Sequence, residues 1–348
     1  MRYPDLAVLT IQSLAMYQVI STFSGIGGSS QGYKQAGLKV LASVEFLDYQ
    51  AANYRLNHPG TKVYQSDIRT LEPLAILAEL GLRPGDLDVL DGSPPCSSFS
   101  TNGIVADGWG KVKQYGNREQ RTDDLFFEYI RFLEAMQPKT FVAENVSGLI
   151  KGVSKGYFNQ FFEAFESAGY KVSAKLLNAA NYEVPQIRQR IIFVGVRCDL
   201  GLNPVFPQPF GKIITASEAI RAYQIDKSED VSISDLQREY WNMTQPGQSM
   251  EDANFRKTGR KGWFSKMKLH PLRPANTITA HAGDDLFHWK EPRHFYTDEL
   301  KALQSFPNDY RLEGSRIRCT EGVGRSVPPK MMEAIARTLA REVLDKIR

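Results

Sequence analysis

The residues with the clearest chemical potential lie in Asp91–Ser100, a short loop that carries two prolines and a cysteine after a buried, mostly apolar run. The proline rings fix the backbone just before Cys96 and remove two N–H donors. Cysteine is intrinsically a strong nucleophile, and its thiolate becomes available in electropositive surroundings. A lone cysteine is more often a small buried apolar residue, and we interpret Cys198 and Cys319 in that way. The sequence therefore predicts a nucleophile at Cys96.

A candidate acid and two candidate cations follow further along the chain. Glu144 lies within Phe141–Val146, at the end of a predicted buried strand, where a partly desolvated carboxyl should have a raised pKa and hold a proton for delivery. Arg188 and Arg190 lie in Val184–Arg190, just before the next strand, and strand alternation should point both the same way.

A glycine-rich segment, Phe23–Gly28, directly follows the first predicted strand. Its glycines would let the backbone approach a ligand and free the N-terminus of the next helix. Glu45 closes the second strand, where a carboxylate can accept hydrogen bonds from a ribose diol, and Asp67 could reach an adenine amino group. Position 30 is Ser30, not the third glycine of a dinucleotide site. The pattern indicates an adenosine-containing cofactor other than NAD, with a tight turn bearing surface carboxylates as the alternative.

These residues must be positioned by alternating strands and helices, which predict crossover units and a mostly parallel sheet. Such sheets bind ligands at the carboxyl ends of their strands, where the residues above lie. The predicted strands are Gln18–Phe23, Lys39–Val44, Leu87–Asp91, Lys139–Ala143 and Arg190–Val196, and the predicted helices are Asp48–Asn57, Asp123–Met136, Tyr157–Ala168 and about Lys330 to Ile347.

Composition narrows the class of protein. The 348 residues are 42% hydrophobic and 24% charged, which is typical of a globular protein and argues against disorder. No apolar run is long enough for a transmembrane helix, and the start lacks the layout of a signal peptide. Three cysteines suit a reducing cytoplasm. A net charge of +4 permits a nucleic-acid partner.

The alternation of short apolar runs with amphipathic stretches ends after Arg197. Asn203–Gly211 is rich in proline, as a domain boundary would be. The following polar region contains a basic stretch, Arg256–Lys268, with Trp263 and Phe264 among its cations. We expect this stretch to face the phosphates of a nucleic acid, while the alternative is a solvated run of charge. The candidates for phosphate contact are Arg256, Lys257, Arg260 and Lys261.

Six motifs in order resemble those of the DNA (cytosine-5)-methyltransferase family and span about Val19 to Arg341. They are FxGxGG (Phe23–Gly28), PPC (Pro94–Cys96), ENV (Glu144–Val146), QxRxR (Gln186–Arg190), an arginine-proline element (Arg273–Thr279) and GxxVPP (Gly324–Pro329). A signature of this size outweighs any single short motif.

The resemblance implies an α/β fold, a Rossmann-like methyltransferase sheet with a smaller, irregular target-recognition domain. It divides the chain into 1–198 (catalytic), 199–272 (target recognition) and 273–348 (return to the catalytic domain). It implies S-adenosylmethionine as cofactor, no metal, and double-stranded DNA as partner of a cytoplasmic, monomeric enzyme of a prokaryote or phage. The implied cofactor-binding residues are Phe23, Ser24, Gly25, Gly27, Gly28, Glu45, Phe46, Asp67, Ile68, Pro94, Arg325, Ser326 and Val327. The implied DNA contacts are Ser100, in the cysteine loop, and Arg256, Lys257, Arg260 and Lys261 of the basic stretch.

The chemistry that the resemblance implies is methyl transfer to cytosine C5. Addition of the Cys96 thiolate to C6 would turn C5 into a nucleophile, with Glu144 as the acid at N3 and Arg188 or Arg190 on the base carbonyl. The target base would have to be flipped out of the duplex. The sequence leaves open the recognised site and whether a cognate restriction endonuclease is a partner.

Other readings remain. A nicotinamide oxidoreductase leaves the PPC and ENV motifs unexplained, and a non-catalytic DNA-binding module would be expected to lose Cys96, Glu144 or the arginines. An RNA cytosine methyltransferase would use the same chemistry. The chain also departs from the family pattern: Ser97 replaces a common glutamine, residues 1–17 are unassigned, and Arg325 replaces a usual asparagine.

Arg325 raises one more alternative. The simpler interpretation pairs this arginine with a nearby acidic residue or with DNA phosphates. The sharper one gives it the carboxylate of carboxy-S-adenosylmethionine, held bidentately, so that the enzyme would install a carboxymethyl group on cytosine C5.

Overall fold

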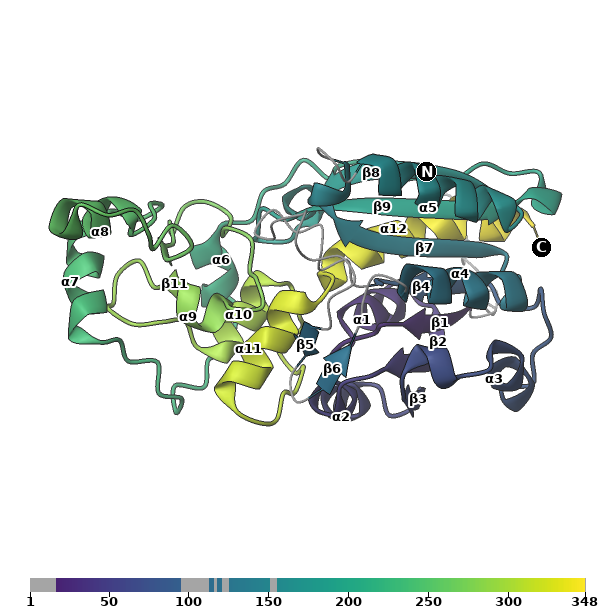
Figure 1. Ribbon diagram of the computed structural model, residues 1–348, viewed down its shortest axis with the longest axis horizontal. Helices are drawn as coiled ribbons and strands as arrows, with labels where there is room; N and C mark the ends of the chain where they lie inside the picture. Colours follow the sequence, from purple (N-terminus) through teal and green to yellow (C-terminus); the bar gives the residue numbers. More distant parts are fainter. Residues whose placement is uncertain (1–16, 95–112, 116–117, 121–124, 151–154, 348) are drawn as a thin grey trace, which may run out of the picture.

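The computed structural model describes residues 17–94, 113–115, 118–120, 125–150 and 155–347. Figure 1 shows a large sheet flanked by helices at one end of the molecule and a smaller, mostly irregular lobe at the other. Among the described residues, no helix is long and apolar enough to cross a membrane.

The large sheet contains seven strands in the order β3-β2-β1-β4-β7-β9-β8. The first five in this order run parallel, and β9 pairs antiparallel with both β7 and β8. The predicted α/β class with a mostly parallel sheet is therefore confirmed. The strands are β1 (Gln18–Thr22), β2 (Lys39–Glu45), β3 (Lys62–Gln65), β4 (Val89–Gly92), β7 (Thr140–Val146), β8 (Tyr170–Asn178) and β9 (Gln189–Arg197).

Strand β8 was not expected from the sequence. It lies at the edge of the sheet, and seven of its nine residues are exposed or half-buried. An edge strand of this kind has no need for the apolar run by which buried strands are recognised.

Helices cover both faces of the sheet. The side chains of α3 (Pro73–Glu79), α4 (Leu125–Met136) and α5 (Lys155–Ser167) join one core cluster, and those of α1 (Gly28–Gln35) and α12 (Pro329–Glu342) join the other. Figure 1 shows α5 and α12 on opposite sides of β9. Helix α2 (Asp48–Asn57) has its predicted bounds, whereas the last helix ends at Glu342 and continues as a short 3-10 turn, Leu344–Lys346.

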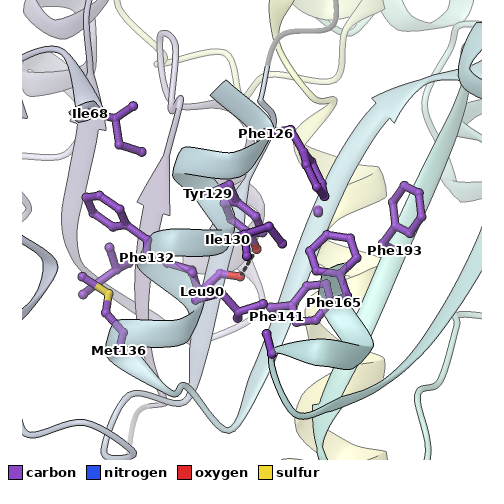
Figure 2. Packing of buried hydrophobic residues seen from close by; sticks show 14 of the residues in the cluster. Ile68, Leu90, Phe126, Tyr129, Ile130, Phe132, Met136, Phe141, Phe165 and Phe193 are labelled. Atoms are coloured by element: carbon purple, nitrogen blue, oxygen red, sulfur yellow. Dashed lines mark hydrogen bonds between the residues drawn. The ribbon is translucent and has the colours of Figure 1, made fainter. Parts of the chain in front are cut away.

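Aromatic side chains fill the core under α4 (Figure 2). Phe141 stacks on Phe165, with ring centroids 4.4 Å apart, and Tyr129 packs edge-on against both rings. The buried Tyr129 hydroxyl donates to the carbonyls of Leu90 (3.1 Å) and Val142 (3.2 Å). Because a buried hydroxyl without a partner would be costly, these bonds fix α4 over β4 and β7.

The smaller lobe is built from short elements and long connections. No helix or strand occurs from residue 201 to residue 215, the part that includes the proline-rich segment. A separate small core gathers Ile233, Tyr240, Met250, Ala253 and Phe287. The elements that follow the proline-rich segment in the chain, up to α12, are α6 (Ala216–Arg221), α7 (Asp235–Met243), α8 (Glu251–Thr258), β10 (Met267–Lys268), α9 (Ala282–Asp285), β11 (Leu286–Phe287), α10 (Thr297–Leu303) and α11 (Arg316–Arg325).

A separate two-stranded sheet pairs β5 (Lys113–Tyr115) antiparallel with β6 (Arg118–Gln120).

Candidate active site

Three neighbouring strands bring the predicted site residues to one edge of the sheet. Strands β1, β4 and β7 lie side by side and parallel. The glycine-rich segment follows β1, the segment that contains Pro94 follows β4, and Glu144 lies near the end of β7. The structure therefore places the described parts of three motifs together, as the carboxyl-end rule predicts.

The turn after β1 needs unusual backbone angles. Phe23, Gly25 and Gly27 all have positive φ (54°, 57° and 98°), and Gly28 then begins α1. Ser24 is buried, and its backbone N–H donates to the carbonyl of Val44 at 3.2 Å. Positive φ is strained for residues other than glycine, so the turn is held by its surroundings.

Gly27 and Gly28 allow other parts of the protein to approach the turn closely. A Cβ on Gly27 would lie 2.6 Å from His58 Nε2 and 2.7 Å from the Tyr310 hydroxyl, and a Cβ on Gly28 would lie 2.3 Å from the carbonyl oxygen of Val327. His58 and Tyr310 hydrogen-bond to each other at 3.2 Å, and Tyr310 also donates to the carbonyl of Ile26. The glycine-rich turn is therefore packed tightly against His58 and against Tyr310 and Val327 from the second half of the chain.

Glu45 is bound to this turn. Its carboxylate accepts from the backbone N–H groups of Gly25 (2.7 Å) and Leu47 (2.8 Å). Burial raises the pKa of Glu45, and these backbone hydrogen bonds oppose the rise. Each carboxylate oxygen keeps acceptor capacity beyond one bond, so Glu45 can still bind a ribose diol.

The remaining cofactor candidates have mixed surroundings. Asp67 accepts from the Arg69 backbone N–H (3.0 Å) and pairs with its guanidinium (2.9 Å). The Asp67 carboxylate therefore binds within its own turn, and its contact with an adenine amino group stays a prediction. Ile68 is buried, while Phe46, which follows Glu45, is half-buried.

Glu144 pairs with Arg190. The arginine Nε lies 2.9 Å from Glu144 Oε1, and both side chains are largely buried. The next residue, Asn145, donates through Nδ2 to the carbonyl of Pro94 at 3.4 Å. Strands β7 and β9 thus supply a buried carboxylate–guanidinium pair, and Asn145 joins the end of β7 to the start of the PPC segment.

Arg188 has different contacts from Arg190. Strand β9 begins at Gln189, so strand alternation does not extend to Arg188, which donates to the carbonyls of Ile278 (2.8 Å) and Gly324 (3.1 Å). It is 2% exposed, and burial lowers its pKa. Arg188 therefore joins QxRxR to the arginine-proline element and to the last motif.

The last motif packs against the first. Val327 and Ser326 lie against Gly28, and the Ser326 hydroxyl donates to the carbonyl of Gly322 at 2.8 Å. Arg325 forms an ion pair with Glu321, one helical turn earlier, at 2.7 Å. A nearby acidic partner is what the simpler interpretation of this arginine predicts.

The basic stretch is only partly available for phosphates. Lys257 pairs with Glu239, and Lys266 pairs with Asp285 at 3.0 Å. The expectation that every cation in the stretch faces phosphates is wrong for Lys268. It is 6% exposed, donates to the carbonyls at the end of α7, and lies 3.4 Å from the centroid of the Trp241 ring. Arg256, Arg260 and Lys261 are exposed, and the described residues form no ion pair with them.

Two predicted residues, Cys96 and Ser100, lie outside the described residues. The sequence interpretation also missed buried polar groups around the turn after β1, above all Asp91 and the pair of His58 and Tyr310. Asp91 had a visible signal, because it interrupts an otherwise apolar strand. His58 and Tyr310 had none, since their contact joins distant parts of the chain.

Comparisons with known proteins agree with this geometry. The family model described as C-5 cytosine-specific DNA methylase matches residues 17–341. Among curated proteins, the chain is 34% identical to the Type II methyltransferase M1.HphI of Haemophilus parahaemolyticus, over 92% of this chain and 86% of the relative. It is 31% identical to the Type II methyltransferase M.NgoFVII of Neisseria gonorrhoeae, with the same two coverages.

Solved structures share the fold at lower identity. A prophage-encoded E. coli protein described as a DNA modification methyltransferase superposes with a TM-score of 0.75 at 22% identity, over 94% of this chain and 99% of that one. A DNMT2 variant from Spodoptera frugiperda superposes with a TM-score of 0.67 at 17% identity, over 95% and 99% of the two chains.

Proposed function

The chain belongs to the C-5 cytosine-specific DNA methylase family, and from that membership we propose that it methylates cytosine C5 in a specific double-stranded DNA sequence. The observation that carries the proposal is the buried Glu144–Arg190 pair, at 2.9 Å, near the carboxyl end of β7. A flipped cytosine needs a proton donor at N3 and a hydrogen-bond donor at its carbonyl, and this pair offers both kinds of group.

The proposed division of labour begins with a covalent step. Cys96 adds to C6 of the base, a bond that makes C5 nucleophilic. Glu144 holds and delivers the proton at N3. Arg190 fixes the carboxyl of Glu144 and reaches the base carbonyl, while Arg188 supports the site by joining it to the last motif. After transfer, a water molecule takes the proton from C5, the C6–S bond breaks and releases the Cys96 thiolate, and the proton on N3 returns to Glu144, which restores the aromatic ring.

The turn after β1 fits S-adenosylmethionine, which would supply an electrophilic methyl group. Glu45 lies where it can accept from a ribose diol, next to the backbone of Gly25. The start of α1 and the packed last motif, with Ser326 and Val327, close the other side of the turn. These residues would hold the cofactor, and Phe23 and Pro94 would border it.

We assign DNA recognition to residues 199–272, between a catalytic part (1–198) and its return (273–348). The exposed cations Arg256, Arg260 and Lys261 support this assignment, because exposed cations are the groups that bind phosphates. Lys257 would have to exchange Glu239 for a phosphate. The Type II relatives support a cognate restriction endonuclease as a functional partner.

Two alternatives are tested together with the main proposal. An RNA substrate would need the same chemistry, and a carboxymethyl donor would need Arg325 to leave Glu321. The ion pair supports the simpler interpretation of Arg325 and hence the methyl donor.

The test is incubation of the protein with methyl-labelled S-adenosylmethionine and either duplex DNA or tRNA. We expect label in DNA alone. Label in tRNA alone would overturn the DNA assignment, and absence of label from both would overturn methyl transfer.

A further inference from the structure

A buried carboxylate, Asp91, lies between the two halves of the proposed site and has no part in the mechanism above. It is at the carboxyl end of β4, the strand between β1 and β7. Strand β1 leads into the cofactor turn, and β7 carries Glu144. The Asp91 side chain reaches the first turn of α1, where the Ser29 hydroxyl donates to it.

The partners of Asp91 are all neutral. Oδ2 accepts from the hydroxyls of Ser21 and Ser29, both at 2.7 Å, and Oδ1 accepts from the Tyr33 hydroxyl at 3.3 Å. The residue is 2% exposed, and within the described part of the chain no lysine, arginine or histidine pairs with it. A buried carboxylate without a cation is costly, so the fold leaves a negative charge without its counter-charge.

The titratable groups that face Asp91 do not supply that charge either. They are Tyr33 on α1, Tyr54 on α2, Tyr129 on α4 and Glu144 on β7. Burial raises the pKa of Asp91 to about 6, with a smaller contribution from the charge of Glu144. At neutral pH the carboxylate is therefore mostly ionised, and its surroundings are neutral or negative.

We propose that Asp91 makes the site prefer the sulfonium cation of S-adenosylmethionine to the neutral thioether of S-adenosylhomocysteine. This inference rests on the proposed function, because the cation reaches Asp91 only if the chain takes this cofactor. In the proposed reaction the methyl group would pass from the turn after β1 to a base near Glu144, so the sulfonium would lie over the carboxyl ends of β1, β4 and β7. The buried anion thus favours the charged substrate and eases the release of the uncharged product.

The rival explanation is a purely structural tie between β1, α1 and β4. Asp88 provides the matched control, because it is also a buried aspartate and it directly precedes β4 in the chain. Its carboxylate accepts from the Gln18 backbone N–H (2.8 Å) and pairs with Lys139 (2.7 Å). Asp88 is therefore structural and already neutralised, at the edge away from the site.

The experiment is calorimetric titration of the DNA-free protein with S-adenosylmethionine and with S-adenosylhomocysteine, for wild type, Asp91→Asn and Asp88→Asn. The measured preference is the dissociation constant for S-adenosylhomocysteine divided by that for S-adenosylmethionine. We expect Asp91→Asn to lower this ratio by about tenfold, the effect of unit charges on the order of 10 Å apart at an effective dielectric near 20. Asp88→Asn should keep the wild-type ratio. An unchanged ratio in Asp91→Asn, or equal weakening of both ligands, would overturn the proposal.

A second measurement needs no variant, should Asp91→Asn fail to fold. In wild type the preference for the cation should decline from about pH 8 to about pH 5 as Asp91 takes up a proton, and Glu144→Gln should keep that decline. A flat ratio in wild type would overturn the inference. Failure of wild type to bind S-adenosylmethionine at all would overturn the proposed function with it, whereas a ratio insensitive to Asp91 and to pH would overturn the inference alone.

Discussion

Charged groups at the candidate active site are buried, whereas many of those in the smaller lobe are exposed. At the sheet edge, Glu144, Arg188 and Asp91 are buried and fixed by contacts to distant segments. In the smaller lobe, Arg256, Arg260 and Lys261 are exposed on or just after a short helix. Fixed buried groups suit chemistry, which needs a defined geometry, and exposed cations suit phosphates, which present the same charge at every sequence.

The largest effect is expected at the proposed nucleophile. Cys96→Ala should lower methyl transfer by more than about 10³-fold and leave DNA binding close to wild type, because the lobe that binds DNA is intact. Wild type should also form a trapped covalent complex with DNA that contains 5-fluorocytosine, since C5 then has no proton to lose. The control is Cys198→Ala, because the structure exposes Cys198 and so contradicts the buried position that the sequence suggested for it. Turnover by Cys96→Ala would exclude the covalent step.

The next effect tests the buried pair. Glu144→Gln should slow transfer by roughly 10²- to 10⁴-fold, the range typical of a lost general acid. Glu299→Gln is the matched control, because Glu299 is also buried and pairs with Arg293 at 2.8 Å outside the candidate active site. Equal loss of activity in both variants would mean that Glu144 acts through stability, as melting curves would show.

A smaller, uniform effect is expected in the lobe. The double variant Arg260→Glu, Lys261→Glu should weaken binding to all duplex sequences about tenfold or more and reduce the salt slope by about 2, one for each lost phosphate contact. Lys257→Glu should do less, because Lys257 already pairs with Glu239. Lys39→Glu, at the amino edge of the sheet, is the control. An unchanged salt slope in the double variant would place DNA elsewhere.

The smallest effect is expected at Arg325. Its ion pair with Glu321 is partly exposed, so Arg325→Asn should change the free energy of unfolding by no more than about 1 kcal/mol. Nucleoside mass spectrometry with both donors offered should give 5-methylcytosine for wild type and variant alike. 5-Carboxymethylcytosine from wild type, lost in Arg325→Asn, would instead establish the altered donor.

The sequence was most informative where a motif directly follows a buried parallel strand. The helix Asp48–Asn57 and the sheet class were predicted because apolar periodicity is local. Strand Tyr170–Asn178 was missed because an edge strand carries no apolar run. The burial of Arg188 and Lys268 could not be predicted, since their acceptors come from segments far away in the chain.

The central claim, methylation of cytosine at C5, is tested most directly by mass spectrometry of nucleosides from duplex DNA treated with the protein and S-adenosylmethionine. We expect 5-methylcytosine as the product, formed in one sequence context and absent after treatment with Cys96→Ala. Methylation of an exocyclic amine, as N4-methylcytosine or N6-methyladenine, would contradict it.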